Sequence, residues 1–325
     1  MLFPSCLYLW ALAILAGTIC AYNLKDDYTR NGYADFFDDF NFWTDGDPTN
    51  GTVDYVDQQS AWNNGLIGNG GNIYLGVDHA NVASGRGRKS VRLTSKATYN
   101  PGTLVVADIT HMPETCGTWP AFWTTSATAN WPQEGEIDIV EQVNNAKHNE
   151  ISIHVSEKQG KCYIDPNIDQ TAERDRFTEC SEETNLGCDV NDRRENSFGS
   201  GFNNNNGGVY AMEWTAWAVK VWFFPRDSIP TGDHGPLGSW PEPSGWGSPT
   251  SVFRSSEGDG CDLDKHFKNQ KIVINTTFCS WASAAWESSG CKASTGWEKC
   301  EDYVWWNWSA FGNAFWTFNS LKVFT

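Results

Sequence analysis

Short runs of alternating apolar and polar residues recur along the chain and are separated by Gly, Asn, Asp or Pro. These runs cover residues 90–94, 103–109, 136–143, 150–155, 208–214, 216–224, 271–277 and 314–324. Alternation with period two between turn residues is typical of half-buried β-strands, and many such strands indicate a sandwich or a barrel. The runs 209–214 and 217–224 are expected to form a hairpin joined at Thr215 and Ala216. The sequence therefore predicts an all-β fold.

Three segments do not have the alternation of strands. They are the charged segment 165–200, the turn-rich segment 202–208 (FNNNNGG) and the segment 227–251, which is dense in Pro and Gly. Strand patterns continue on both sides of each, so none is expected to link two domains. We predict a single domain over residues 22–325, with long loops that rim one face. Loops of that length in a compact domain usually carry function.

Residues 1–21 contain no charged side chain and include an apolar run from Leu7 to Ile19. This run is too short to span a bilayer comfortably, so it predicts a secretory signal peptide that is cleaved near residue 21. An uncleaved membrane anchor is the alternative. The chain's end has no apolar tail after a polar spacer, which disfavours a lipid anchor there. We expect a secreted, extracellular protein.

Cysteine usage agrees with export. Without the leader the chain keeps an even number of cysteines: Cys116, Cys162, Cys180, Cys188, Cys261, Cys279, Cys291 and Cys300. Up to four disulfides are expected, and their pairing stays open. N-glycosylation sequons begin at Asn50, Asn275 and Asn307, with occupancy also open. No C-x₂-C pair occurs and the six His are scattered, so we expect no zinc site. We expect no other cofactor either, although a structural cation stays open.

The net charge of the chain indicates which classes of partner to expect. The chain has 40 acidic and 23 basic side chains and a formal net charge of −17. Such a protein repels nucleic acid and anionic lipid, so we expect neither a nucleic-acid partner nor a membrane partner. The chain also has 18 Trp, and tryptophan is hard to bury completely, which favours some rings displayed for stacking. A neutral partner with apolar faces fits both properties.

The segment 131–141 (WPQEGEIDIVE) is the most informative about chemistry. In a strand, Glu136 and Asp138 share one face while Ile137 and Ile139 point into the core. Strict alternation would leave Glu141 on the wrong face, but one extra residue, a β-bulge, would return it to the carboxylate face. Carboxylates gathered on one face repel one another and serve no packing purpose. They therefore indicate a functional site.

The spacing of these acids suits glycoside chemistry. With the bulge counted out, Glu136 and Glu141 are about 13 Å apart between Cα atoms, so their carboxyls can approach to ~5–6 Å. A separation of about 5–5.5 Å is typical of retaining glycosidases. Asp138 between them can share a proton with Glu136 and raise a neighbouring pKa. A solvated acidic strand face or a calcium cluster is the alternative.

The run Glu136-Ile-Asp-Ile-Val-Glu141 resembles the catalytic signature of glycoside hydrolase family 16 in its bulged form, typical of laminarinases and related β-1,3(4)-glucanases. Further matching segments are 116–123 (CGTWPAFW), His154, 207–214 (GGVYAMEW), 221–225 (VWFFP), 261–262, 266–269 and 319–323. The similarity runs over nearly all of residues 22–325 and is greatest to the secreted fungal enzymes.

The resemblance implies a concanavalin A-like β-jelly-roll, a sandwich of two curved antiparallel sheets with substrate along the concave one. It also implies roles for the acids: Glu136 is the nucleophile, Glu141 the general acid/base and Asp138 the assisting carboxylate. The expected reaction is hydrolysis of a neutral β-glucan, β-1,3- or mixed β-1,3/1,4-linked, by a secreted monomer. A cell-wall transglycosylase and a non-catalytic glucan-binding lectin are the alternatives, and cleavage of a β-1,6-glucan stays open.

The resemblance further implies a cleft lined by rings that stack on sugar. The expected substrate-binding residues are Trp119, Trp123, Trp131, His154 and Trp281. The alternative for each Trp is core packing, and for His154 a structural role. Fungal relatives usually have Cys-Gly-Asp-Trp where this chain has Cys-Ser-Trp, so the role of Trp281 is the least supported. We expect a mildly acidic pH optimum, because Glu141 must be protonated while Glu136 is ionised.

Overall fold

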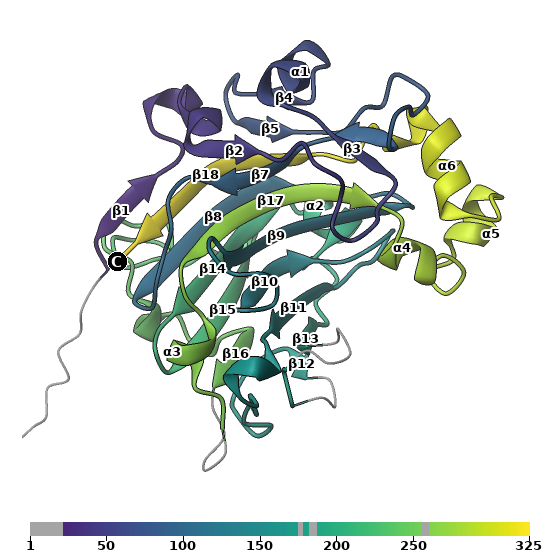
Figure 1. The fold of residues 1–325 in the computed structure, drawn as a ribbon. Coiled ribbons are helices and arrows are strands. Elements are labelled where there is room, and N and C mark those ends of the chain that lie inside the picture. The colour runs from purple at the N-terminus through teal and green to yellow at the C-terminus, as the bar shows by residue number, and fades with distance from the viewer. Residues whose placement is uncertain (1–21, 175–177, 182–186, 255–259) are drawn as a thin grey trace, which may run out of the picture.

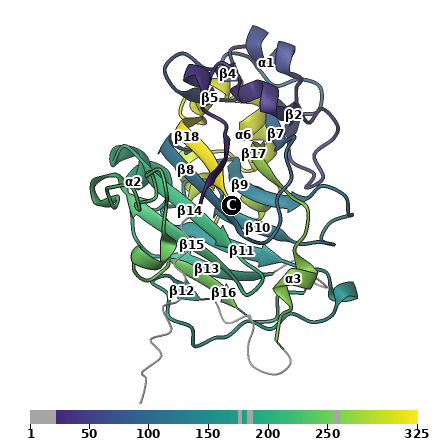
Figure 2. The ribbon, with the colours of Figure 1, turned by 90° about the vertical axis from the view of Figure 1, so that its left-hand side faces the viewer.

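The computed structural model describes residues 22–174, 178–181, 187–254 and 260–325. The expected signal peptide, residues 1–21, lies outside these residues. Most of the described strands form two curved antiparallel sheets packed face to face (Figures 1 and 2). We call them the front sheet and the back sheet. The predicted all-β sandwich with long loops is confirmed.

The front sheet has the strand order β12-β13-β11-β10-β9-β17-β7-β2. Its strands are β2 (Phe40–Phe42), β7 (Arg92–Ser95), β9 (Thr118–Ser126), β10 (Glu136–Glu141), β11 (Asn149–His154), β12 (Glu173–Arg174), β13 (Cys188–Asp192) and β17 (Gln270–Phe278). The strands β12 and β13 fall inside segment 165–200, where we expected none. Half-buried polar residues alternate with buried ones in β13. The run is short and lies among charged residues, so the alternation was not recognised in the sequence.

The back sheet has the strand order β16-β15-β14-β8-β18-β5-β4, and β1 pairs with β18. Its strands are β1 (Leu24–Asp27), β4 (Ile67–Gly68), β5 (Ile73–Leu75), β8 (Thr103–His111), β14 (Gly208–Trp214), β15 (Ala218–Pro225), β16 (Ser251–Arg254) and β18 (Trp316–Phe324). The predicted hairpin is present as β14 and β15, with Trp214 opposite Val219. Trp217 lies in its turn and is 80% exposed, whereas the sequence pattern placed it in the second strand.

Apolar side chains from both sheets fill the space between them. Ile137 and Ile139 of β10 pack there with Phe122 of β9 and Met212 of β14, all almost completely buried. This burial follows from the alternation of the strands, whose second face is left free for other contacts. The core therefore holds β10 from behind and leaves its carboxylate face open.

The outer face of the back sheet is apolar and is covered by the Pro- and Gly-rich segment 227–251. Trp222 and Phe224 of β15 pack edge-to-face against Trp246 of that segment. The segment begins within the 3₁₀ turn η4 (Arg226–Ser228), contains the 3₁₀ turn η5 (Pro243–Gly245) and ends at the first residue of β16. It is a loop, as predicted, and its role is to seal this face.

Short helices and a small parallel strand pair complete the fold. They are α1 (Gln58–Asn63), α2 (Gly199–Asn204), α3 (Leu263–His266), α4 (Trp281–Ala284), α5 (Cys291–Thr295), α6 (Cys300–Trp306), β3 (Val53–Tyr55) and β6 (Arg88–Ser90), with 3₁₀ turns η1 (Asn31–Tyr33), η2 (Phe36–Asp39), η3 (Glu157–Gln159) and η6 (Trp308–Phe311). Helix α2 reaches into segment 202–208, which we expected to be loop. Helices of one or two turns leave no apolar 3.6-residue pattern to detect. None of the described helices is long and apolar enough to cross a bilayer.

Helices α4, α5 and α6 gather at one end of the sheets (Figure 1) and are tied there by disulfides. The cysteines of the described residues pair as Cys116–Cys291, Cys162–Cys261, Cys180–Cys188 and Cys279–Cys300. The expected four disulfides are confirmed, in a pairing that the sequence left open. Disulfides persist in oxidising compartments, which is consistent with an exported protein.

The sequons differ in accessibility. Asn275 lies in β17 and is only 6% exposed. Its side-chain oxygen accepts a hydrogen bond from Trp123, and its nitrogen donates one to Tyr55. A glycan on Asn275 would therefore disturb a buried, hydrogen-bonded amide of the folded protein. Asn50 lies on the surface and Asn307 is half-buried, so Asn50 is the most accessible of the three.

Candidate active site

A β-bulge in β10 turns Glu141 to the same face as Glu136. Against β11, Asp138 lies opposite Ser152, but the register then slips, so that Glu141 lies opposite Glu150. The register against β9 slips at the same place. Val140, which strict alternation would have exposed, is completely buried in the core. The bulge predicted from the spacing of the acids is present.

The residue before β10 also fixes where the first acid points. Gly135 has a φ of 78°, and a Cβ on it would lie 2.3 Å from Cδ1 of Phe267. A side chain is therefore excluded on both conformational and steric grounds. The tight approach to Phe267 brings the chain into β10 with Glu136 as its first residue.

A cavity of about 1160 Å³ lies over the front sheet and contains the predicted site. The predicted residues that line it are Glu136, Asp138, Glu141, Trp119, Trp123, Trp131, His154 and Trp281. They come from β9, β10, β11, the loop before β10 and the first residue of α4. The structure thus brings all eight together, although they span more than 160 positions of the sequence.

Glu136 is held by neighbours that favour its carboxylate. Trp131 donates a hydrogen bond from Nε1 to Oε2 of Glu136, at 2.9 Å. His154 lies opposite Glu136 on β11. Burial and the negative charge of Asp138 raise the pKa of Glu136, whereas His154, Trp131 and Arg92 oppose that rise.

Asp138 is the most buried of the acids, with its side chain 2% exposed. Its Oδ2 accepts a hydrogen bond from the hydroxyl of Ser152 at 2.6 Å and lies 3.4 Å from Nε2 of His154. Glu136, Asp138 and His154 each offer a ligand atom, and these atoms lie within 4.8 Å of one another. They are the one such group among the described residues and could hold a divalent cation, but they also form a ready proton network.

Glu141 lies at the other end of the carboxylate row. Trp119 donates a hydrogen bond from Nε1 to Oε1 of Glu141, at 2.7 Å. Burial, together with the charge of Asp138, raises the pKa of Glu141 well above its ordinary value, and the Trp119 bond opposes this. Glu136 has more partners that favour its ionised form, so we expect Glu136 to lose its proton before Glu141. That order suits a nucleophile at Glu136 and an acid at Glu141.

Aromatic rings form the walls of the cavity. Trp131 is 47% exposed, and its ring is free to stack on a sugar face. Trp123 is fixed by its bond to Asn275, at 2.7 Å. Trp119 and Trp281 pack edge-to-face with their ring centroids 5.5 Å apart. Trp281, the least supported of the predicted residues, thus lies in the cavity and against the ring that binds Glu141.

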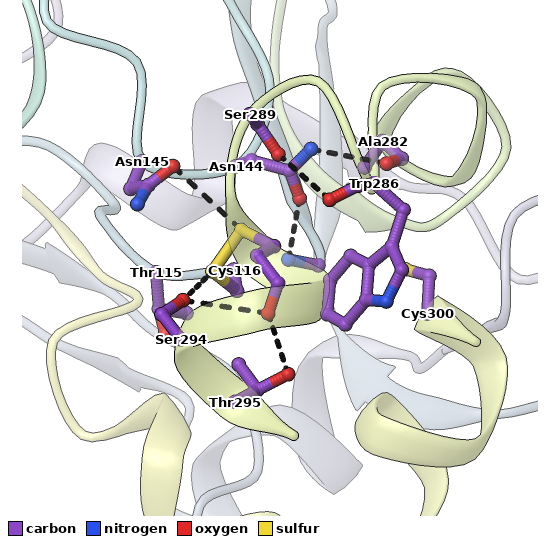
Figure 3. The surroundings of a disulfide bond; sticks show 12 residues. Thr115, Cys116, Asn144, Asn145, Ala282, Trp286, Ser289, Ser294, Thr295 and Cys300 are labelled. Atoms are coloured by element: carbon purple, nitrogen blue, oxygen red, sulfur yellow. Dashed lines mark hydrogen bonds between the residues drawn. A yellow bond between two sulfur atoms is a disulfide. The ribbon is translucent and has the colours of Figure 1, made fainter. Parts of the chain in front are cut away.

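The helix that begins with Trp281 is tied to the start of β9 (Figure 3). Asn144 is completely buried with a φ of 60°. Its side-chain oxygen accepts a hydrogen bond from Gly117 N–H, and its nitrogen donates one to the carbonyl of Ala282, at 2.8 and 3.0 Å. The Cys116–Cys291 disulfide lies beside this bridge and joins the segment just before β9 to the first residue of α5. These links hold the wall that carries Trp281.

Sequence reasoning missed other residues of the cavity. The guanidinium of Arg92 lies between the rings of Trp43 and Trp123, 5.2 and 5.0 Å from their centroids. Arg92 occupies a polar position of the alternating run 90–94, so its exposure on this face was detectable but its partners were not. Trp43 lies outside every predicted strand, and Asn275 lies in the run 271–277 but was considered only as a sequon. Both reach the cavity only when distant segments of the chain come together.

Known proteins are similar to this chain in sequence and in fold. The chain matches the model of an XgeA-like, catalytic GH16 domain over residues 40–324. It is 44% identical to an endo-1,3(4)-β-glucanase of Arthroderma benhamiae over 98% of this chain, and 39% identical to the endo-1,3(4)-β-glucanase xgeA of Emericella nidulans over 93% of this chain. The chain spans 67% of the first relative and 47% of the second.

Solved structures are similar over almost the whole described fold. Laminarinase 16A of Phanerochaete chrysosporium, with β-glucans in donor and acceptor sites, superposes with a TM-score of 0.83 at 36% identity. An elongating GH family 16 β-1,3-glucosyltransferase superposes with a TM-score of 0.82 at 42% identity. Each comparison covers 94% of this chain and 100% of the other chain.

Proposed function

The chain belongs to glycoside hydrolase family 16, and from that premise we propose that it cleaves β-1,3- or mixed β-1,3/1,4-glucans by double displacement with retention. The observation that carries the proposal is the bulged strand β10, which directs Glu136 and Glu141 into one cavity with Asp138 between them. Retaining glycosidases need two carboxyl groups on opposite sides of a scissile bond.

In the first step an oxygen of Glu136 attacks the anomeric carbon, while the bond from that carbon to the leaving glucan oxygen breaks. Glu141 gives its proton to the leaving oxygen. In the second step Glu141 takes a proton from water, the water oxygen bonds to the anomeric carbon, and the bond to Glu136 breaks. Asp138 and His154 hold Glu136 in place and exchange a proton with it. Two inversions leave the anomeric configuration unchanged.

The cavity suits a neutral polysaccharide. Trp119, Trp123, Trp131 and Trp281 line the cavity, and Trp131 is the most exposed of these rings. A chain with a net charge of −17 does not attract polyanions. The relatives named above are endo-1,3(4)-β-glucanases, and the laminarinase binds 6-O-glucosyl-laminaritriose. These observations support a β-glucan that carries β-1,3 linkages.

Transfer to a second sugar is the alternative outcome of the same intermediate. The glucosyltransferase described above is 42% identical to this chain. Transfer needs an acceptor glucan to reach the glycosyl–Glu136 ester before water does. Both outcomes use the same carboxylates, so the site chemistry does not change between them.

Product analysis separates these outcomes. Laminarin, lichenan and a β-1,6-glucan are incubated with the protein, and reducing ends and chain lengths are measured. Hydrolysis predicts new reducing ends and shorter chains from laminarin, whereas transfer predicts longer chains with few new reducing ends. NMR of the first product should show the β-anomer. An α-anomer first, or no change in any glucan, would contradict the proposal.

The setting of the enzyme is part of the same proposal. We propose one catalytic domain over residues 22–325 that is secreted and acts as a monomer, with the eight residues named above as its site. The disulfides and the fungal relatives support an extracellular protein. N-terminal sequencing and light scattering of the secreted protein test cleavage of the leader and the oligomeric state.

A further inference from the structure

The β-bulge that directs Glu141 into the cavity leaves part of the backbone of β10 without a regular partner in β11. The pairing runs in register up to Asp138 and Ser152, and it resumes at Glu141 and Glu150 after one extra residue. An extra residue interrupts the ladder of backbone hydrogen bonds. Something must satisfy these backbone groups, because buried unpaired N–H and C=O groups are costly.

The side chain of Asn149 supplies the missing bonds. Its Nδ2 donates to the carbonyl of Ile139 at 2.9 Å, and its Oδ1 accepts from the N–H of Glu141 at 3.0 Å. These two backbone groups flank Val140 on either side. One amide therefore bridges the bulge and fixes the backbone of Glu141 itself.

Asn149 is itself firmly held. It is completely buried, it lies opposite Asp192 of β13, and its N–H donates to the hydroxyl of Ser197 at 3.0 Å. The one proton of that hydroxyl is shared between the carbonyl oxygens of Asp192 and Arg194, at 3.0 and 2.7 Å. The backbone of Asn149 is thus anchored to β13 and Ser197, and its side chain is not among the residues that line the cavity.

We propose that Asn149 is a positioning residue for Glu141. An amide offers a donor and an acceptor at the two distances required, whereas a carboxylate lacks the donor and an alkyl group lacks both. Without the bridge the bulge is free to relax towards regular alternation. Val140 would then take the place of Glu141 on the cavity face, and Glu141 would turn away from the cavity. This inference rests on the proposed function, in which Glu141 is the acid/base.

A pair of substrates distinguishes positioning of Glu141 from general stabilisation. Laminarin cleavage needs Glu141 to protonate the leaving oxygen. A 2,4-dinitrophenyl β-laminaribioside with azide does not: dinitrophenolate leaves as the anion, and azide then displaces Glu136 from the anomeric carbon without a general base. General acid–base catalysis typically contributes 10²–10⁴-fold. Asn149→Ala is expected to lower kcat on laminarin by about 10²-fold and to change the dinitrophenyl reaction with azide by less than about threefold.

Asn203 offers a matched control. Its side-chain oxygen accepts from the N–H of Met112 and its nitrogen donates to the carbonyl of Met112, at 2.9 and 3.0 Å. Asn203→Ala removes the same two kinds of bond at a site that does not line the cavity. It should change both reactions only in proportion to the folded fraction, which thermal unfolding measures.

Further variants keep the test decisive. If Asn149→Ala does not fold, Asn149→Asp keeps the shape and the acceptor but loses the donor, and it should show the same split between substrates. Equal losses on both substrates, or full activity on laminarin in a folded variant, would overturn the proposal. Glu141→Ala should show a larger split than either. If Glu141→Ala shows none, the acid/base assignment fails instead.

Discussion

The two outer faces of the sandwich carry nearly identical tryptophan pairs with opposite surroundings. Trp222 of the back sheet and Trp246 of the loop that covers it lie with ring centroids 5.5 Å apart at 84°, and Trp119 of the front sheet and Trp281 of α4 lie 5.5 Å apart at 80°. In each pair one ring belongs to a strand of the sheet and the other to a segment that packs over it. The difference lies in what the indole N–H groups meet.

On the back face the N–H groups end on backbone carbonyls. Trp222 donates to Gly247 and Trp246 donates to His234, both in the loop that covers this face. On the front face Trp119 donates to Glu141. The same ring pair thus seals one face and tunes an acid on the other. Ring packing therefore says little about function, and the acceptor of the N–H distinguishes the two.

The largest expected effect is the loss of activity when an acid of the front face is replaced. Glu136→Gln or Glu141→Gln should lower kcat by about 10³-fold or more, because each residue makes or breaks a bond or transfers a proton in the reaction. The temperature of unfolding should stay the same or rise, because a buried carboxyl is removed from a crowded row. Kinetics on laminarin and calorimetry measure both. Retained activity together with a large fall in melting temperature would contradict the assignment, because these acids would then stabilise the fold and not take part in the reaction.

The matching change on the back face should do the opposite. Trp246 is 8% exposed and packs on Trp222 and Phe224. Trp246→Ala should lower the free energy of unfolding by about 3–5 kcal/mol, the usual cost of truncating a buried Trp. Activity per folded molecule should be unchanged. Denaturant unfolding and kinetics on the same sample check this, and loss of kcat in fully folded protein would show that the faces are coupled.

Asp138→Asn tests the electrostatics of the front face. The charge of Asp138 raises the pKa of both Glu136 and Glu141. Its removal should therefore move both limbs of the pH–rate profile to lower pH, by roughly one to two pH units. In the wild type the acid limb, which reports Glu136, should lie above the pKa of an ordinary glutamate because burial raises it. A profile that shifts to higher pH on this substitution would contradict the assignment.

The smallest expected effect is a shift of the pH–rate profile when the indole N–H of Trp119, but not that of Trp222, is removed. Trp119→Phe keeps a ring against Trp281 but removes the bond that favours ionised Glu141, so the alkaline limb should move up by about one pH unit. Trp222→Phe removes a bond to a backbone carbonyl and should leave the pH profile unchanged. Equal profiles for the two variants would mean that the Trp119 bond does not tune Glu141.

The sequence predicted the parts of the site that one strand determines. The order of acids in residues 136–141 required a bulge, and the alternation of Ile137 and Ile139 showed which face is core. The helical end was not predictable, because α4, α5 and α6 are fixed by Cys116–Cys291 and Cys279–Cys300, whose pairing no local pattern reveals. No local pattern identifies Asn149 either, because its role depends on bonds to the backbone of the neighbouring strand β10.

Trapping the covalent intermediate tests the nucleophile most directly. A 2-deoxy-2-fluoro-β-laminaribiosyl fluoride should form a stable ester, and mass spectrometry of peptides should locate the disaccharide on Glu136. Attachment to Glu141, to Asp138 or to a residue outside β10 would contradict the assignment, as would steady turnover of a glucan with inversion and no trapped ester.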